Sequence, residues 1–253
     1  MFADKGIKRA PLGARMQRRP QNFHSHLIEE LGSRIAGGVY PEGSILPGNV
    51  ELLDEFGVSR TVLREAIRTL SAKGLLESRA RVGTRVLPRS RWNMFDSDVL
   101  TWHVRAGIST QFIAFLSEVR MAVEPEAAAL GAIRRTEEQA QRISHWFEQM
   151  ARSDQTSEEF ALNDLEFHRM VALASDNPFM ISLSSVIEIA LATAFTISSP
   201  VEDENDFELA VRLHRRIAEA IVEKEPDIAR IAMRQAIQSG IDRAVAALQN
   251  GLK

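Results

Sequence analysis

The chain has 253 residues, of which 45% are hydrophobic and 26% charged, and it contains no cysteine. This composition excludes a mainly disordered protein, and the lack of thiols excludes disulfides, thiolate metal sites and cysteine nucleophiles. No segment approaches the roughly 20 apolar residues that a membrane-spanning helix needs, and the N-terminus lacks the apolar stretch of a signal peptide. We therefore expect a cytoplasmic protein without a membrane partner, long enough for two modest domains.

Charge is distributed unevenly along the chain. Residues 1–92 hold 16 of the 31 Lys and Arg residues but 9 of the 34 Asp and Glu residues, so this part carries +7 and the remainder −10. A basic module is typical of proteins that bind polyanions, because cations that replace condensed counterions on phosphate gain affinity. A solvated basic surface would have the same charge, so charge alone does not decide between the two.

The N-terminal part has the pattern of a small helical unit followed by a hairpin. Residues 1–21 lack apolar periodicity and hold six basic residues, which predicts a disordered basic tail. Apolar spacing then predicts a first helix from Phe23, a second from Asn49 and a third that is N-capped by Ser59. The alternating segment 75–88 predicts two strands. This order indicates a winged helix-turn-helix DNA-binding domain over residues 22–88.

The remainder is expected to be helical. Residues 89–95 form the predicted linker, and residues 96–250 the predicted effector-binding and dimerisation domain. Helical periodicity, with start and stop signals at Thr136, Asp176 to Pro178 and Lys224 to Pro226, predicts helices at 96–105, 110–134, 137–152, 157–175, 178–198, 204–223 and 226–248. Long helices joined by short turns favour an antiparallel bundle with an internal pocket. The expected fold class is mainly α, with an N-terminal winged helix-turn-helix and a C-terminal all-helical antiparallel bundle.

The third helix has one apolar and one basic face. A recognition helix must send polar side chains into the major groove while its other face packs on the domain, and arginine matches the two acceptors on the edge of guanine. The hairpin tip can reach an adjacent groove, with a glycine that lets the backbone approach. The predicted DNA-binding residues are Arg60, Thr61, Arg64, Arg68, Arg79, Arg81 and Gly83. The alternative for these arginines is a solvated helix face.

Several segments resemble one family of regulators. Residues 45–86, ILPGNVELLDEFGVSRTVLREAIRTLSAKGLLESRARVGTRV, resemble the DNA-binding domain of the GntR family. The FCD effector domain of the FadR-like branch is similar to SEVRMAVEPEAAALGA, NDLEFHRMVALASDNP and LHRRIAEAIVEKEPDIARIAMRQAI. Within that branch, WNMFDSDVLTW at 92–102 is most similar to sugar-acid regulators such as galactonate-operon repressors.

The resemblance implies a function and a set of DNA contacts. It implies a homodimeric repressor of a sugar-acid catabolic operon, released from a short palindromic operator by a small carboxylate effector. The family's DNA contacts match Arg60, Thr61, Arg64 and Gly83. At the start of the second helix, where the family commonly has an arginine, this chain has Val50, so one contact is missing and operator preference is expected to differ.

Many domains of this branch bind a divalent metal through an aspartate and three histidines. The resemblance assigns the metal ligands Asp164, His168 and His214, and the i, i+4 spacing of the first two puts them on one helix face. The fourth position is Ala236. Zinc or nickel could bind with water or effector oxygens completing its coordination, at reduced affinity. Alternatively, these three residues would hydrogen-bond the effector directly.

Arg120 lies in a largely apolar helix. A buried arginine needs an anionic partner, which here is either Glu124 or an incoming carboxylate. The resemblance makes Arg120 the expected effector-binding residue, together with Asp164, His168 and His214. An internal pair between Arg120 and Glu124 is the alternative.

An enzyme is the rival interpretation, and we expect none. The sequence has no GxSxG, P-loop or GxGxxG motif and no Glu-x-x-His pair of a di-iron bundle, so no catalytic residue is predicted. A metal-dependent hydrolase would rest only on Asp164, His168 and His214, and turnover by the isolated helical domain would reveal it. An architectural DNA-binding protein that senses nothing would leave the acidic helical domain unexplained.

Overall fold

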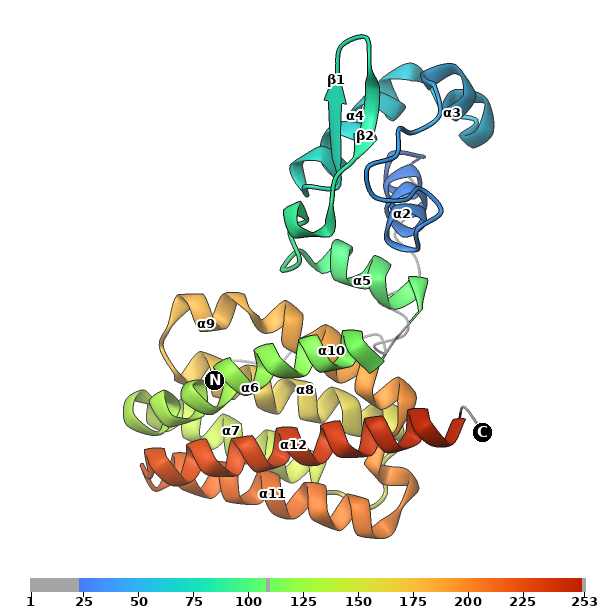
Figure 1. Cartoon of the computed structure of the whole chain (residues 1–253). Coiled ribbons are helices and arrows are strands. Elements are labelled where there is room, and N and C mark those ends of the chain that lie inside the picture. Colours follow the sequence, from blue (N-terminus) through green and yellow to red (C-terminus); the bar gives the residue numbers. More distant parts are fainter. Residues whose placement is uncertain (1–22, 108–109, 252–253) are drawn as a thin grey trace, which may run out of the picture.

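The computed structural model describes residues 23–107 and 110–251 (Figure 1). The predicted basic tail, residues 1–21, lies outside the described residues. The N-terminal unit follows the predicted order, with α2 (Phe23–Ala36), α3 (Asn49–Phe56), α4 (Arg60–Ala72), β1 (Leu76–Arg79) and β2 (Gly83–Val86). Figure 1 shows the hairpin and α3 at the end of this unit that faces away from the helical bundle.

Local signals in the sequence set the elements of this unit. Gly57 ends α3 in the left-handed conformation, and the Ser59 hydroxyl accepts a hydrogen bond from the backbone N–H of Val62 at the start of α4. The strands β1 and β2 pair antiparallel, with Leu76 opposite Val86. Buried side chains of α2, α3, α4 and the hairpin form one core. The predicted winged helix-turn-helix is confirmed.

A short connection leads from the hairpin into the bundle through the 3-10 helix η1 (Arg89–Arg91) and α5 (Ser97–Ala106). Trp102 of α5 is fully buried in the core of the N-terminal unit, and Lys73 Nζ lies 2.7 Å from both carboxylate oxygens of Asp96, the N-cap of α5. The same helix also packs against α10 (Ser184–Ile197) of the bundle. Helix α5 therefore bridges the two parts of the molecule.

The remaining chain is an antiparallel helical bundle, as predicted. Its other elements are α6 (Thr110–Arg134), α7 (Glu137–Met150), α8 (Ser157–Ala174), α9 (Pro178–Ser182), η2 (Pro200–Glu202), α11 (Glu204–Val222) and α12 (Pro226–Gly251). Small side chains such as Ala128 and Ala132 let α6 approach its neighbours, and Phe167, Ile217 and Met233 fill the core between α8, α11 and α12. No helix within the described residues has the length and apolarity to span a bilayer.

One predicted helix is divided in the structure. The sequence predicts a continuous helix over 178–198, whereas α9 ends at Ser182 and α10 starts at Ser184. The Ser182 hydroxyl donates to the Pro178 carbonyl oxygen at 2.7 Å, and the Leu183 N–H donates to the Met180 carbonyl oxygen, a tighter turn than an α-helix makes. Apolar residues continue across the break, so periodicity alone did not reveal it.

Candidate functional site

The N-terminal unit has a groove between the start of α4 and the hairpin tip. Its volume is about 1020 Å³. Six of the seven predicted DNA-binding residues line it, namely Arg60, Thr61, Arg64, Arg79, Arg81 and Gly83. Arg68 is one turn further along α4 and is not among the described residues that line the groove. The fold thus brings residues of a helix and a hairpin to one basic surface.

The arginines of α4 remain available to a ligand. The side chains of Arg64 and Arg68 are 79% and 83% exposed, and their ion pairs with Glu65 span 3.6 and 4.0 Å. Pairs of this kind contribute little stability in water, so exchanging Glu65 for a phosphate or a base costs little. Val50 also lines the groove and is 73% exposed. It can contact a thymine methyl group but donates no hydrogen bond.

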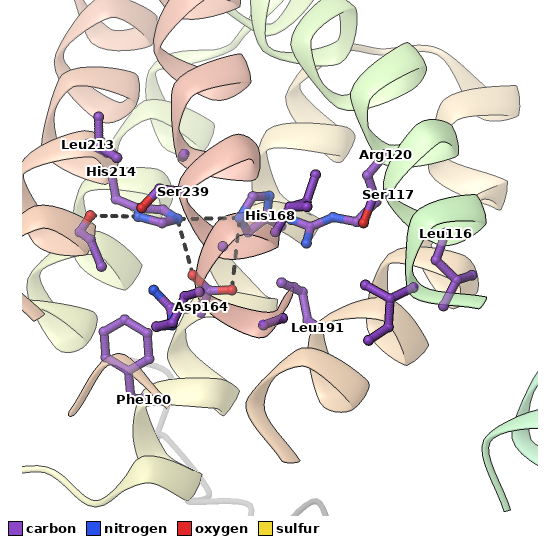
Figure 2. A pocket seen from close by; sticks show the side chains of 17 residues that line it. Leu116, Ser117, Arg120, Phe160, Asp164, His168, Leu191, Leu213, His214 and Ser239 are labelled. Atoms are coloured by element: carbon purple, nitrogen blue, oxygen red, sulfur yellow. Dashed lines mark hydrogen bonds and ion pairs between the residues drawn. The ribbon is translucent and has the colours of Figure 1, made fainter. Parts of the chain in front are cut away.

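A second site lies inside the bundle. Asp164 and His168 are one turn apart on α8, and His214 reaches them from α11 (Figure 2). Nε2 of His214 lies 3.1 Å from Oδ1 of Asp164 and 3.4 Å from Nε2 of His168, which lies 3.9 Å from Oδ2 of Asp164. All three residues are buried, and one ligand atom from each lies within 4.8 Å of the others.

Contacts on the outer side of the two histidines set their orientation. The Nδ1–H of His214 donates to the carbonyl oxygen of Ala210 at 2.8 Å, because a carbonyl oxygen can only accept. Nδ1 of His168 is in contact with Oε2 of Glu124. In the neutral ring, both Nε2 lone pairs therefore face the cluster. Partners of this kind hold metal-binding histidines in the required tautomer.

With both histidines in that tautomer, the cluster presents acceptor atoms that a cation could bind. Two Nε2 lone pairs and the Asp164 carboxylate face one another, and Oδ2 of Asp164 has no hydrogen-bond partner among the described residues. Burial raises the pKa of Asp164, but His168, His214 and Arg120 outweigh it and lower that pKa to about 2. A carboxylate and two imidazoles are ligands that zinc and related divalent metals prefer. The residues therefore fit a divalent metal.

These residues border a cavity of about 50 Å³ between α6, α8, α10, α11 and α12. Ala236, at the position where the fourth histidine was expected, lines it and offers no ligand atom. Its polar lining also includes the hydroxyls of Ser117 and Ser239, and Figure 2 shows Ser117 next to Arg120 on α6. The cavity thus combines a candidate metal-binding cluster with hydroxyl and guanidinium groups.

Arg120 lines the cavity and is also paired within the protein. Its Nε donates to Oε1 of Glu124 at 2.5 Å, and both side chains are buried. Burial raises the pKa of Glu124, but Arg120 and His168 outweigh it and lower that pKa to about 2. The pair considered as the alternative for Arg120 is therefore present. Whether Arg120 also binds an effector stays a prediction.

Two residues of this site were missed by the sequence reasoning. Glu124 was recognised as a partner for Arg120 but not for His168, which belongs to another helix. Arg243 of α12 lines the cavity and was not singled out. It follows Ala236 by seven residues, or two helical turns, so both lie on the same face of α12. That spacing is the signal that could have found it.

Comparisons with known proteins agree with both parts of the molecule. Residues 23–86 match the family described as bacterial regulatory proteins of the gntR family, and residues 116–239 match the FCD domain. The chain is 36% identical to the uncharacterized HTH-type transcriptional regulator YieP of Escherichia coli K12, over 87% of this chain and 94% of that protein. It is 33% identical to the galactonate operon transcriptional repressor of the same strain, over 88% and 96%.

A solved structure shows the same fold. Lar, which controls the expression of the Listeria monocytogenes agr system, superposes with a TM-score of 0.62 at 18% identity, over 90% of this chain and 99% of that chain. The matches confirm the prediction of a DNA-binding transcriptional regulator rather than an enzyme. The chain belongs to the GntR family of transcriptional regulators and carries the FCD domain of its FadR-like branch.

Proposed function

We propose that this regulator represses a sugar-acid catabolic operon and that a small carboxylate effector, bound in the cavity of the helical domain, releases it from its operator. The observation that carries the proposal is the buried cluster of Asp164, His168 and His214 beside that cavity. A relative that represses the galactonate operon supports a sugar acid as the effector class.

A divalent metal, zinc or nickel, would be held by Asp164, His168 and His214. Because Ala236 supplies no fourth ligand, the metal would keep positions open for oxygen atoms of the effector. The metal would act as a Lewis acid that binds those oxygens, and Glu124 and Ala210 keep the two histidines in the tautomer that binds it.

The charges around the cavity favour an anionic ligand. The guanidinium groups of Arg120 and Arg243 offset the carboxylates of Glu124 and Asp164. A divalent cation on the cluster would leave an excess of two positive charges in a buried site. Since buried charge is costly unless it is neutralised, a carboxylate would bind there in preference to a neutral sugar.

The size of the cavity connects binding to movement. A cavity of about 50 Å³ has room for only a few water molecules, so a six-carbon acid would enter only when the surrounding helices separate. Leu191 of α10 lines the cavity, and α10 packs against α5. A shift of α10 would therefore reach α5, which Lys73 joins to the end of α4. An effector that binds only the separated arrangement would shift the population toward it.

The DNA-binding half of the proposal rests on the groove lined by Arg60, Thr61, Arg64, Arg79 and Arg81. A homodimer formed through the helical domains would set two α4 helices about one turn of DNA, roughly 34 Å, apart on a short palindrome. A displacement of α4 in one protomer would change the distance between the two α4 helices, so they would no longer match the palindrome. Release of the operator would follow without any change in the DNA-contacting residues themselves.

A thermal-shift screen of metal-stripped protein tests the proposal. The ligands are D-galactonate, D-gluconate and other small carboxylates, each with and without zinc or nickel, and the variant is Arg120→Ala. A sugar acid that raises the melting temperature of the wild type, more strongly when metal is present, supports the sensor. A screen in which no carboxylate stabilises the wild type overturns the sensor proposal. The assignment of the DNA-binding groove would not be affected, because it depends on other residues.

A further inference from the structure

Arg243 of α12 lies where the buried cavity meets the protein surface. It lines the cavity beside the metal-binding cluster, and it also lines a surface groove of about 820 Å³ that runs between α11 and α12. Leu213 and Ser239 are shared by the two linings as well. These three side chains border both the groove and the cavity, so Arg243 can be reached from either side.

The guanidinium of Arg243 has no partner in the described part of the chain. Its Nε is buried without a hydrogen-bond partner there, and no described residue forms an ion pair with it. Burial lowers the pKa of Arg243, and Asp206 and Asp164 oppose that shift from a distance. Buried polar groups in native proteins are almost always hydrogen-bonded, and an exception calls for a bound group that the chain itself does not supply.

Arg120 differs from Arg243 in this respect. The Nε of Arg120 donates to Glu124, and Glu124 in turn contacts His168. Much of the charge of Arg120 is therefore neutralised, and moving it toward a ligand would unpair Glu124. Arg243 can bind an anion without breaking any contact of this kind.

We propose that Arg243 is the residue that anchors the carboxylate of the effector, and that the effector is a hydroxy acid. The hydroxyls of Ser117 and Ser239 line the same cavity and provide partners for hydroxyl groups of the ligand. Arg120 is then a positioning residue, which holds Glu124 against His168. This inference rests on the proposed sensor function, since it names the group that recognises the effector in that site.

Calorimetric titration of D-galactonate into zinc-loaded protein tests this assignment. The variants are Arg243→Gln, which removes the charge, and Arg243→Lys, which keeps it. The matched control is Arg234→Gln, which changes an exposed arginine of the same helix. The expected result is binding about 10- to 100-fold weaker in Arg243→Gln, a smaller loss in Arg243→Lys and no change in Arg234→Gln. The neutral polyol galactitol should not bind.

Zinc affinity and operator affinity without acid serve as checks that each variant is folded. Operator affinity should equal the wild-type value in Arg243→Gln because the DNA groove is untouched, and zinc should still bind because its three candidate ligands are unchanged. Wild-type affinity for D-galactonate in Arg243→Gln overturns the role of Arg243 and leaves the sensor function in place. If neither D-galactonate nor D-gluconate binds the wild type, the inference falls together with the sugar-acid sensor.

Discussion

Nδ1 of His214 is hydrogen-bonded at 2.8 Å to the carbonyl oxygen of Ala210, one turn earlier in α11. This bond turns Nε2 of His214 toward Asp164 and His168. Glu124 has the same effect on His168. The outer contacts that a metal site needs are thus in place around the three candidate ligands, and Ala236 lines the cavity at the position expected for a fourth.

Restoring a histidine at position 236 should strengthen metal binding. Ala236→His would complete a tetrahedral site, so we expect zinc affinity to rise on the order of tenfold or more. Competition with a fluorescent chelator measures it. Gln238→His, at an exposed position of the same helix, is the control and should leave the affinity unchanged. Unchanged zinc affinity in Ala236→His would show that the wall of α12 does not face the metal.

Arg64 is expected to contribute to DNA binding and not to stability. Its side chain is 79% exposed, so Arg64→Ala should alter the free energy of unfolding by less than about 0.5 kcal/mol. Loss of a guanine contact should weaken operator binding by about 1 to 3 kcal/mol, whereas loss of a phosphate contact should lower the salt slope by about one. Fluorescence anisotropy on an operator selected from random DNA separates the two. Arg142→Ala, exposed on α7, is the control, and equal effects of both substitutions would contradict the assigned groove.

Gly74 holds the connection between the two parts of the molecule against the winged unit. Its φ is +83°, and an added Cβ would lie 2.1 Å from the carbonyl oxygen of Arg91. Gly38 has a similar φ of +77°, but no described atom lies within 4 Å of a Cβ there. Gly38→Ala should therefore lower the free energy of unfolding by about 1 to 2 kcal/mol, because alanine is strained only by the left-handed conformation there. Gly74→Ala should lower it clearly more. Urea unfolding measures the free energy of unfolding of both variants. Equal decreases would show that the backbone at Arg91 moves aside freely.

His103 should make stability depend on pH near neutrality. Its Nδ1–H donates to the Val99 carbonyl oxygen at 3.0 Å, and its ring stacks on Phe112 of α6 with centroids 5.8 Å apart. Burial lowers the pKa of His103 below its usual 6.5, the Val99 carbonyl opposes this, and Arg89 adds to the lowering.

The direction of that dependence follows from proton binding. As the pH falls below 6.5, the unfolded chain takes up the proton before the folded one, so the free energy of unfolding should decrease. Above 6.5 the contribution of His103 should be constant. In His103→Phe this contribution should vanish, which chemical denaturation from about pH 7.5 to 5.5 measures. The same slope in wild type and His103→Phe would assign the dependence to other groups.

Local signals explain why most elements were predictable. Ser59 and Thr136 each accept a backbone hydrogen bond at the start of the helix that they were expected to mark. The break at Leu183 has no such signal, since neither Gly nor Pro lies at the point where α9 ends. The Arg120 and Glu124 pair was foreseeable because residues four apart on a helix are neighbours.

Contacts between helices were beyond the sequence alone. The contact of Glu124 with His168 depends on how α6 packs against α8, and no periodicity within either helix encodes it. The same holds for Trp102, since nothing in the sequence of α5 shows that this side chain joins the core of the N-terminal unit. The unpaired state of Arg243 likewise depends on which charged groups the neighbouring helices place near it.

Linkage between the cavity and the operator is tested most directly by measuring operator affinity with and without a saturating sugar acid whose binding is verified by thermal shift in the same sample. If the effector releases the repressor, the acid should weaken operator binding by about 5- to 150-fold, and the operator should weaken binding of the acid by the same factor. Operator affinity that stays unchanged while the acid is bound would contradict it.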